Sequence, residues 1–156
     1  MKTLLIMRHG QAQAHAASDS LRELTERGRQ DVSSVCRALS SELAQSTQLW
    51  MSPYRRARQT MDILVGTLGV NIEPQEVNSL TPESSPKSLC EALEQHDANR
   101  FLIVSHMPLV ADLVQYLTGA EPGRYVFGTA SVARIDAEVF AGGLGQLCWL
   151  RHREDF

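Results

Sequence analysis

Cysteines are few, paired-cysteine motifs are absent, and positive charge is not in excess. The 156 residues contain three cysteines, Cys36, Cys90 and Cys148, an odd number at wide spacing. This pattern excludes a disulfide framework and a cysteine zinc cluster, so we expect all three side chains to pack as small hydrophobic residues. The net charge of −3 argues against a general nucleic-acid binder. Any basic site must therefore be local.

Long hydrophobic runs are also missing. Only a few apolar residues precede Arg8, too short a segment for a signal peptide, and no stretch approaches the length of a membrane span. We therefore expect a cytoplasmic protein with no membrane partner. The sequence contains no internal repeat, linker or low-complexity segment, and its length suits one domain spanning residues 1–156.

Hydrophobic patterning predicts strands that alternate with helices. Short apolar runs that end in polar or turn residues are typical of buried parallel strands. A pair of runs around a glycine-rich turn predicts a closing hairpin, and Pro74 confines one weak strand to a sheet edge. The expected strands are 4–7, 49–52, 70–77, 101–106, 129–136 and 146–151.

Capping residues and prolines mark where the helices begin. Thr25 suits the N-cap of a helix whose apolar face continues to Leu43. Pro53 and Pro108 suit the first turn of a helix because proline lacks an N–H there, and a further short helix is expected near 88–97. The connections are short, which predicts an α/β fold: a three-layer α/β/α sandwich on a mostly parallel sheet, with an antiparallel strand from the C-terminal hairpin.

Polar side chains follow three of the predicted strands. Arg8 and His9 end the first, Ser52 ends the second, and His106 ends the fourth. Because ligands bind where the carboxyl ends of parallel strands meet at one edge, we expect these side chains to share a site. Arg56 follows Ser52 closely, at the start of a helix. Two arginines and two histidines would then surround an anion.

Such a cluster predicts what each histidine does. Guanidinium groups match phosphate oxygens, and helix N-termini near Pro53 and Pro108 add partial positive charge, so a phosphate pocket needs neither a metal nor a cofactor. Neighbouring cations disfavour the imidazolium form and keep His9 neutral, which leaves a ring nitrogen free to attack phosphorus. His106 is better suited to stabilise the phosphoryl oxygens as charge develops.

Four ordered motifs carry a resemblance to a known family. They are Arg8-His9-Gly10, Leu24-Thr25-x-x-Gly28, Ser52-Pro53-x-x-Arg56-Ala57-x-Gln59-Thr60 and Ser105-His106. Their order and spacing, over nearly the whole chain, resemble the histidine phosphatase superfamily, whose fold is phosphoglycerate mutase-like. A longer stretch, Val104-Ser105-His106-Met107-Pro108-Leu109-Val110, is similar to the small phosphohistidine phosphatases of the SixA type.

The resemblance implies a role for each site residue. The residues that it assigns to the phosphate pocket are His9, as the phospho-accepting nucleophile, with Arg8, Arg56 and His106. Ser52 is a further candidate for substrate binding. Arg22, in the loop 11–23 that we expect to arch over the sheet edge, either contacts the ligand or is a solvated loop charge.

One position departs from the pattern of the wider superfamily. Mutases and many phosphomonoesterases carry a glutamate that protonates the departing alkoxide, where this chain has Pro82. An imidazole leaving group has a conjugate-acid pKa of about 6.5 and needs less help. The sequence therefore favours a metal-independent phosphohistidine phosphatase, expected to be a monomer, acting on a histidine-phosphorylated protein such as a phosphotransfer domain or phosphocarrier.

Two other functions stay open at this point. One is a phosphatase of small phosphomonoesters or sugar phosphates in which the adjacent Glu83 supplies the proton. The other is a non-catalytic reader of phosphoproteins. The presence of both His9 and His106 weighs against a reader, because arginines alone would serve binding.

Overall fold

Six strands form one sheet in the computed structural model, which describes residues 1–156. Their spatial order is β3-β2-β4-β1-β5-β6. The bounds are Lys2–Arg8 for β1, Gln48–Met51 for β2, Gln75–Glu76 for β3, Arg100–Ser105 for β4, Val132–Ala137 for β5 and Gly145–Arg151 for β6. The first four strands run parallel, whereas β5 is antiparallel to β1 and β6 is antiparallel to β5. The expected mostly parallel sheet with a C-terminal hairpin is confirmed.

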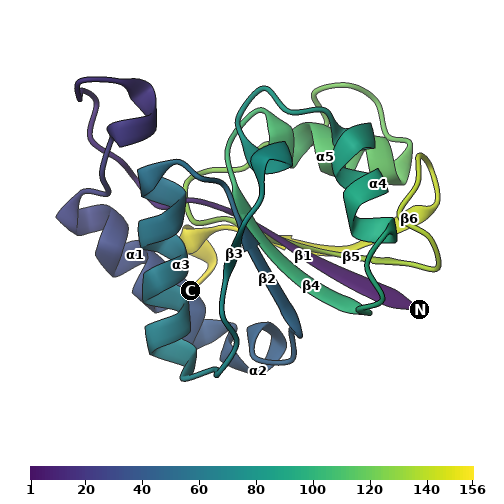
Figure 1. Ribbon diagram of the computed structural model, residues 1–156, viewed down its shortest axis with the longest axis horizontal. Coiled ribbons are helices and arrows are strands. Elements are labelled where there is room, and N and C mark those ends of the chain that lie inside the picture. Colours follow the sequence, from purple (N-terminus) through teal and green to yellow (C-terminus); the bar gives the residue numbers. More distant parts are fainter.

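Helices cover both faces of this sheet. The helices are α1 (Glu26–Ala38), α2 (Ser40–Leu43), α3 (Arg55–Leu68), α4 (Pro86–Glu94) and α5 (Leu109–Thr118), with 3-10 turns η1 (Asp19–Leu21), η2 (Asn78–Leu80) and η3 (Arg153–Asp155). Figure 1 shows α1 and α3 on one side of the sheet and α4 and α5 on the other. The expected three-layer sandwich is therefore confirmed. None of the helices combines the length and the apolar composition that crossing a membrane requires.

Side-chain alternation along β1 joins the two halves of the core. Leu5 and Met7 pack with the buried residues of α1 and α3, while Leu4 and Ile6 pack with those of α4 and α5. All four side chains are buried, which explains why the strand reads as a continuous apolar run.

Thr25 caps α1 as expected, but three element boundaries differ from expectation. The Thr25 hydroxyl accepts from Gly28 N at 2.9 Å. The helix then ends at Ala38 rather than at Leu43, and Leu39 leaves helical geometry before α2 begins. Ser40 and Ser41 follow the break, and serine is a residue type whose hydroxyl can compete with helical backbone hydrogen bonds.

The other two boundaries involve prolines. The helix expected from Pro53 begins at Arg55, because Tyr54 stays extended with its N–H donating to the Ser52 hydroxyl at 3.2 Å. The strand expected over 70–77 shrinks to β3, which follows Pro74 at the sheet edge. Pro108 precedes α5 as expected, and Gly119 ends that helix with a φ of 71°.

The expectation that all cysteines are core residues is wrong for one of them. Cys36 and Cys90 are buried, but Cys148 is exposed. It lies on β6, an edge strand with residues that alternate toward solvent. Period-two alternation, rather than residue type, decides the exposure of Cys148.

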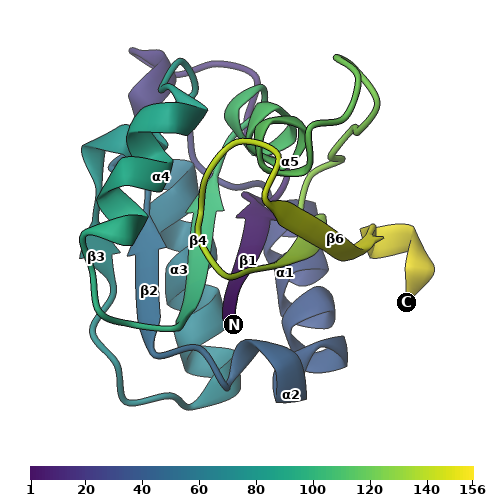
Figure 2. The same ribbon diagram turned by 90° about the vertical axis from the view of Figure 1, so that its right-hand side faces the viewer.

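One edge of the sheet collects the ends of the parallel strands. In Figure 2 the arrowheads of β1, β2 and β4 point the same way, and the loop that carries η1 lies beyond that edge. In Figure 1 this loop projects at the upper left, above α1 and α3. The loop over 11–23 therefore does arch over the strand ends, as predicted.

Candidate active site

The carboxyl edge of the sheet brings the predicted histidines together. The ring centroids of His9, after β1, and His106, after β4, lie 5.0 Å apart. Arg56, in the first turn of α3, donates from Nε to His9 Nε2 at 3.2 Å. His9, Arg56 and His106 are only 5%, 4% and 1% exposed. The three side chains form one buried cluster.

The protonation of His9 follows from its hydrogen bonds. Its Nδ1 lies 2.7 Å from the carbonyl oxygen of Gly10, and a carbonyl only accepts, so Nδ1 carries the proton. The lone pair is then on Nε2, which faces Arg56. Burial, reinforced by the charges of Arg56, Arg8 and Arg22, lowers the pKa of His9 to about 3, although the Gly10 bond opposes the shift. His9 is neutral across the physiological range.

Two glycines let the backbone after His9 come close to α1. A Cβ on Gly28 would collide with Gln11 O, and one on Gly10 would lie 2.7 Å from a Val32 methyl. Gly10 N also donates to the Thr60 hydroxyl at 3.1 Å. The glycines of the two motifs are thus needed for a close approach of chain segments that fixes the position of His9.

Arg8 enters the cluster from the opposite side of the strand. Its Nη1 donates to Phe127 O at 2.7 Å, while its Nε is buried and has no partner. Burial and the charge of Arg56 lower the pKa of the Arg8 guanidinium. Arg8 thus bonds to Phe127, whose side chain packs with the residues of α4 and α5, whereas His9 bonds to Arg56 of α3.

The loop over the edge contributes Asp19, which sequence reasoning missed. Arg56 donates from Nη1 to Asp19 O at 2.7 Å and from Nη2 to the Asp19 carboxylate at 3.2 Å. Arg22 donates to the other carboxylate oxygen at 2.9 Å. These bonds, that from Arg22 foremost, lower the pKa of Asp19. The only signal in the sequence was the three-residue spacing to Arg22.

Asp19 also links Arg22 to the cluster. Arg22 donates to Gln13 O at 2.6 Å in addition to Asp19, and it makes no direct hydrogen bond to Arg8, His9 or Arg56. The Asp19 side chain is 56% exposed. An exposed carboxylate therefore occupies arginine donors of the kind that a phosphoryl group would use.

Ser52 meets His106 rather than the arginines. The hydroxyl of Ser52 lies 2.6 Å from His106 Nε2, and both residues are buried. His106 Nδ1 is buried without a partner. Burial, with smaller contributions from His9 and Arg56, lowers the pKa of His106 to about 2. His106 is also neutral.

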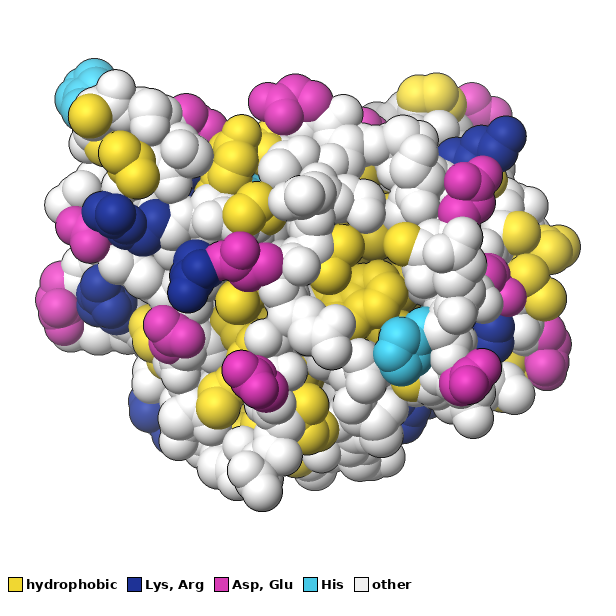
Figure 3. Space-filling model, in the orientation of Figure 1, with side chains coloured by type: hydrophobic (Ala, Val, Ile, Leu, Met, Phe, Trp, Pro, Cys, Tyr) yellow, Lys and Arg dark blue, Asp and Glu magenta, His cyan; other side chains and the backbone are white.

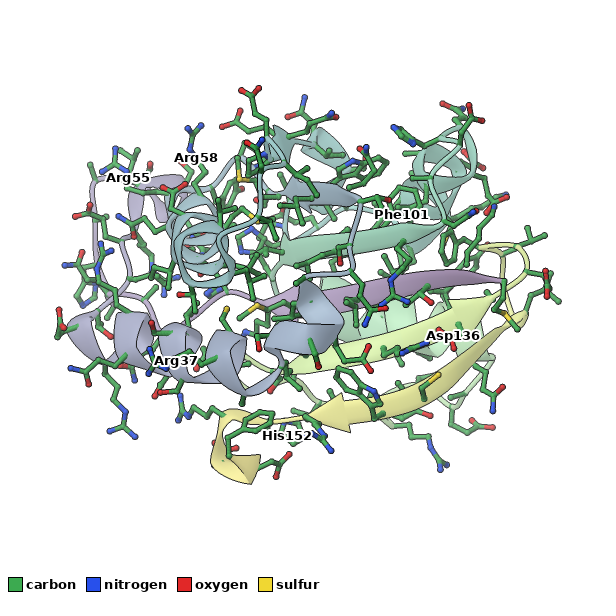
Figure 4. The ribbon with its side chains drawn as sticks, turned by 90° about the horizontal axis from the view of Figure 1, so that it is seen from below. Arg37, Arg55, Arg58, Phe101, Asp136 and His152 are labelled. Atoms are coloured by element: carbon green, nitrogen blue, oxygen red, sulfur yellow. The ribbon has the colours of Figure 1, made fainter.

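Glu83 does not join this cluster. It is exposed and takes part in no hydrogen bond or ion pair. Arg55 and Arg58 also lie outside: Figure 4 shows both on the outer side of α3, pointing away from the sheet, and Arg58 pairs with Glu76. Figure 3, in the orientation of Figure 1, shows basic and acidic side chains interspersed over the visible face of the molecule. The excess of positive charge is therefore local to the cluster.

Unmet hydrogen-bonding capacity marks the cluster as a ligand site. Four buried side-chain polar atoms in the molecule lack a partner, and two of them are Arg8 Nε and His106 Nδ1. Buried polar groups are nearly always paired, so such exceptions call for an explanation. Of the three guanidinium groups here, those of Arg22 and Arg56 share a single carboxylate, that of Asp19, and that of Arg8 pairs with none. An anion that accepts several hydrogen bonds satisfies both the charge and the unpaired atoms.

Known proteins resemble this chain in both sequence and fold. A family model described as the histidine phosphatase superfamily (branch 1) matches residues 4–79. The phosphohistidine phosphatase SixA of Escherichia coli (strain K12) is 29% identical over 143 residues, covering 90% of this chain and 88% of that protein. The SixA homolog of Haemophilus influenzae is 31% identical over 126 residues, covering 74% and 77%.

A solved structure agrees with these matches. The protein histidine phosphatase SixA, complexed with tungstate, superposes with a TM-score of 0.87 at 28% identity, over 98% of each chain. The fold, the motif order and a relative above 30% identity all point to one family. The chain therefore belongs to the histidine phosphatase superfamily.

Proposed function

We propose that this protein is a phosphohistidine phosphatase of the SixA type, with His9 as the nucleophile. The observation that carries the proposal is the neutral His9 ring, whose unprotonated Nε2 lies among arginines. The arginine cations attract an anionic phosphoryl group, and the neutral His9 ring beside them keeps the lone pair that attacks it. The likeness to the SixA proteins supports the same assignment.

In the first step, His9 Nε2 attacks the phosphorus of the substrate phosphohistidine. The new bond joins Nε2 to phosphorus while the bond from phosphorus to the substrate nitrogen breaks. The substrate imidazole leaves as a neutral ring, provided that its other nitrogen has taken a proton from solvent. Arg8 and Arg56 bind the phosphoryl oxygens, and His106 donates to them as charge builds.

In the second step, water attacks the phosphorus of phospho-His9. The phosphorus–nitrogen bond breaks, inorganic phosphate forms, and the water proton passes to phosphate or solvent. Because Nδ1 keeps its proton on Gly10 O, the phosphorylated ring is cationic and departs as neutral imidazole. The same hydrogen bond therefore prepares His9 to attack and to leave.

The environment of the leaving group favours a phosphorus–nitrogen bond as substrate. An alkoxide needs a general acid, and the carboxyl group in the cluster, that of Asp19, has a pKa lowered by two arginines. Glu83 is exposed and makes no hydrogen bond or ion pair with the cluster. A small phosphomonoester is accordingly a poorer substrate than phosphohistidine.

We propose a histidine-phosphorylated protein, a phosphotransfer domain or carrier, as the partner. The chain between α3 and α4 holds only the two-residue β3 and the turn η2, so it adds little cover to the edge beyond the loop over 11–23. Action as a monomer, expected from the sequence, stays a prediction. The cytoplasmic location expected from the sequence stays a prediction.

The test is loss of phosphate label from a histidine-phosphorylated phosphotransfer protein, run beside an alkyl phosphate ester with EDTA throughout. We expect rapid loss from the protein, little from the ester, and an acid-labile phospho-His9 in quenched samples. His9→Ala should abolish turnover, while Glu83→Gln should leave it within about twofold. Consumption of the ester that collapses in Glu83→Gln would instead show a small-molecule phosphatase, and binding without turnover would show a reader.

A further inference from the structure

Ser52 is fully buried at the end of β2, and its hydroxyl has two neighbours. Tyr54 N donates to Ser52 Oγ at 3.2 Å, and His106 Nε2 lies 2.6 Å from the same oxygen. A serine hydroxyl has one proton to donate and two lone pairs. The Tyr54 N–H uses one lone pair. The bond to His106 must use either the hydroxyl proton or the second lone pair.

The two arrangements differ in what they leave unpaired. If His106 Nε2 donates, the Ser52 proton has no acceptor and His106 Nδ1 is a buried lone pair without a donor. If Ser52 donates, its proton is paired and the one unmet group is a His106 Nδ1–H. Each unpaired buried polar group costs free energy, so the second arrangement, which leaves one such group instead of two, is favoured.

The expected ligand selects the same arrangement. A phosphoryl dianion only accepts hydrogen bonds, and a bare Nδ1 lone pair beside it would repel its oxygens. An Nδ1–H would donate to them. In the ring, Nδ1 lies on the opposite side from the edge that contacts Ser52, and His106 stands 5.0 Å from His9 between ring centroids.

We propose that Ser52 is a positioning residue: its hydroxyl donates to His106 Nε2 and thereby fixes the tautomer that presents Nδ1–H to the phosphoryl group. This revises the expectation that Ser52 binds substrate itself. The part that concerns the phosphoryl group rests on the proposed function, whereas the tautomer is a property of the free protein.

The tautomer is measured directly by long-range proton–nitrogen correlation of the 15N-histidine-labelled protein at neutral pH. We expect the His106 Nδ1 resonance at the position of a protonated nitrogen and Nε2 at that of a bare one. Ser52→Ala should lose this preference. The matched control is Ser105→Ala, which removes another buried hydroxyl, one that donates to Leu80 O, and should leave the His106 signals unchanged.

Kinetics gives a second readout. Ser52→Ala should lower kcat by about 10–100-fold with little change in KM, and Ser52→Thr should restore part of it. His106→Asn keeps an amide donor near the Nδ1 position, while His106→Gln places one near Nε2. We expect His106→Asn to retain about tenfold more activity than His106→Gln.

A protonated Nε2 in the wild-type protein would overturn the proposal, and so would a tautomer that Ser52→Ala does not change. These results do not depend on the substrate. If the tautomer is as proposed but phosphohistidine is not hydrolysed, the proposed function fails while the role of Ser52 in setting the ring stands.

Discussion

Arginines gather at two places along the sheet, and their partners differ. Near the amino ends of β1 and β4, Arg134 pairs with Glu42 at 2.9 Å and with Asp136 at 3.1 Å, and Arg100 lies 3.7 Å from Glu42. Thr3 adds a hydrogen bond to Asp136 at 2.9 Å. We call these residues the amino-end network. Figure 4 shows Asp136 on the sheet, at the opposite end of the molecule from Arg55 and Arg58 of α3.

At the carboxyl edge, by contrast, arginines outnumber carboxylates. Arg22 and Arg56 share Asp19, and Arg8 has a carbonyl partner and one unpaired nitrogen. The two histidines beside them are neutral. A balanced network needs no ligand, whereas an excess of buried positive charge costs free energy until an anion binds. Charge balance, not the number of arginines, separates the structural cluster from the functional one.

Among the arginines of the two clusters, the largest expected effect is loss of transition-state binding in Arg56→Ala. We expect kcat/KM toward phosphohistidine to fall by about 10³-fold, because a preorganised charged donor disappears. Steady-state kinetics on the phosphoprotein measures it. Arg58→Ala, two residues farther along α3 and exposed, is the matched control and should stay within about twofold. If kcat/KM of Arg56→Ala stayed within tenfold of wild type, the carboxyl-edge cluster would not differ from the amino-end network in function.

Acid should destabilise the folded protein through the buried histidines. Their folded pKa values, about 3 for His9 and about 2 for His106, lie below the unfolded value near 6.5. The unfolded chain therefore binds more protons between these limits. The free energy of unfolding should fall as pH drops below about 6.5, by up to about 1.4 kcal/mol per pH unit for each histidine.

Urea denaturation of the wild type and His106→Asn between pH 4 and 7 measures this dependence. In the variant, the free energy of unfolding should change less steeply with pH, by the contribution of one histidine. Equal slopes in the two proteins would mean that His106 is protonated, or in contact with water, in the folded state.

The amino-end network should affect stability and leave catalysis alone. Arg134→Ala removes the cation that Glu42 and Asp136 share, leaving Glu42 the longer contact to Arg100 and Asp136 the Thr3 hydroxyl, and should lower the free energy of unfolding by about 2 kcal/mol. Urea titration at pH 7 reports the loss. We expect kcat/KM of the folded Arg134→Ala variant to be unchanged, unlike that of Arg56→Ala. A large fall in kcat/KM would contradict a purely structural role for the amino-end network.

The smallest effect expected is on phosphate affinity in Asp19→Asn. Removing the carboxylate that holds Arg22 and Arg56 raises the excess of positive charge, so inorganic phosphate should inhibit at about tenfold lower concentration. Competitive inhibition assays measure this, with Glu23→Gln in the same loop as the control. Weaker phosphate binding in Asp19→Asn would show that Asp19 orients the arginines more than it competes with the ligand.

Much of the site could be predicted because it depends on rules that are local or topological. An apolar run that ends in Arg8 and His9 implies a buried parallel strand, and parallel strands share one carboxyl edge. The same reasoning brought His106 and Arg56 to that edge. The neutrality of His9 was predicted from its neighbouring cations, although burial, which the sequence prediction did not use, is the larger cause of its lowered pKa.

Tertiary structure alone decided the pairings between distant segments. Asp19 reaches Arg56 across 37 residues, and Ser52 reaches His106 across 54. Such contacts depend on where a loop folds back and which way a hydroxyl turns, and residue type does not encode either. The exposure of Cys148 and that of Glu83 are decided in the same way, by strand register and loop path. Hydrophobic pattern determined which strands lead to the site, and the packing of those strands determined which side chains are left unpaired there.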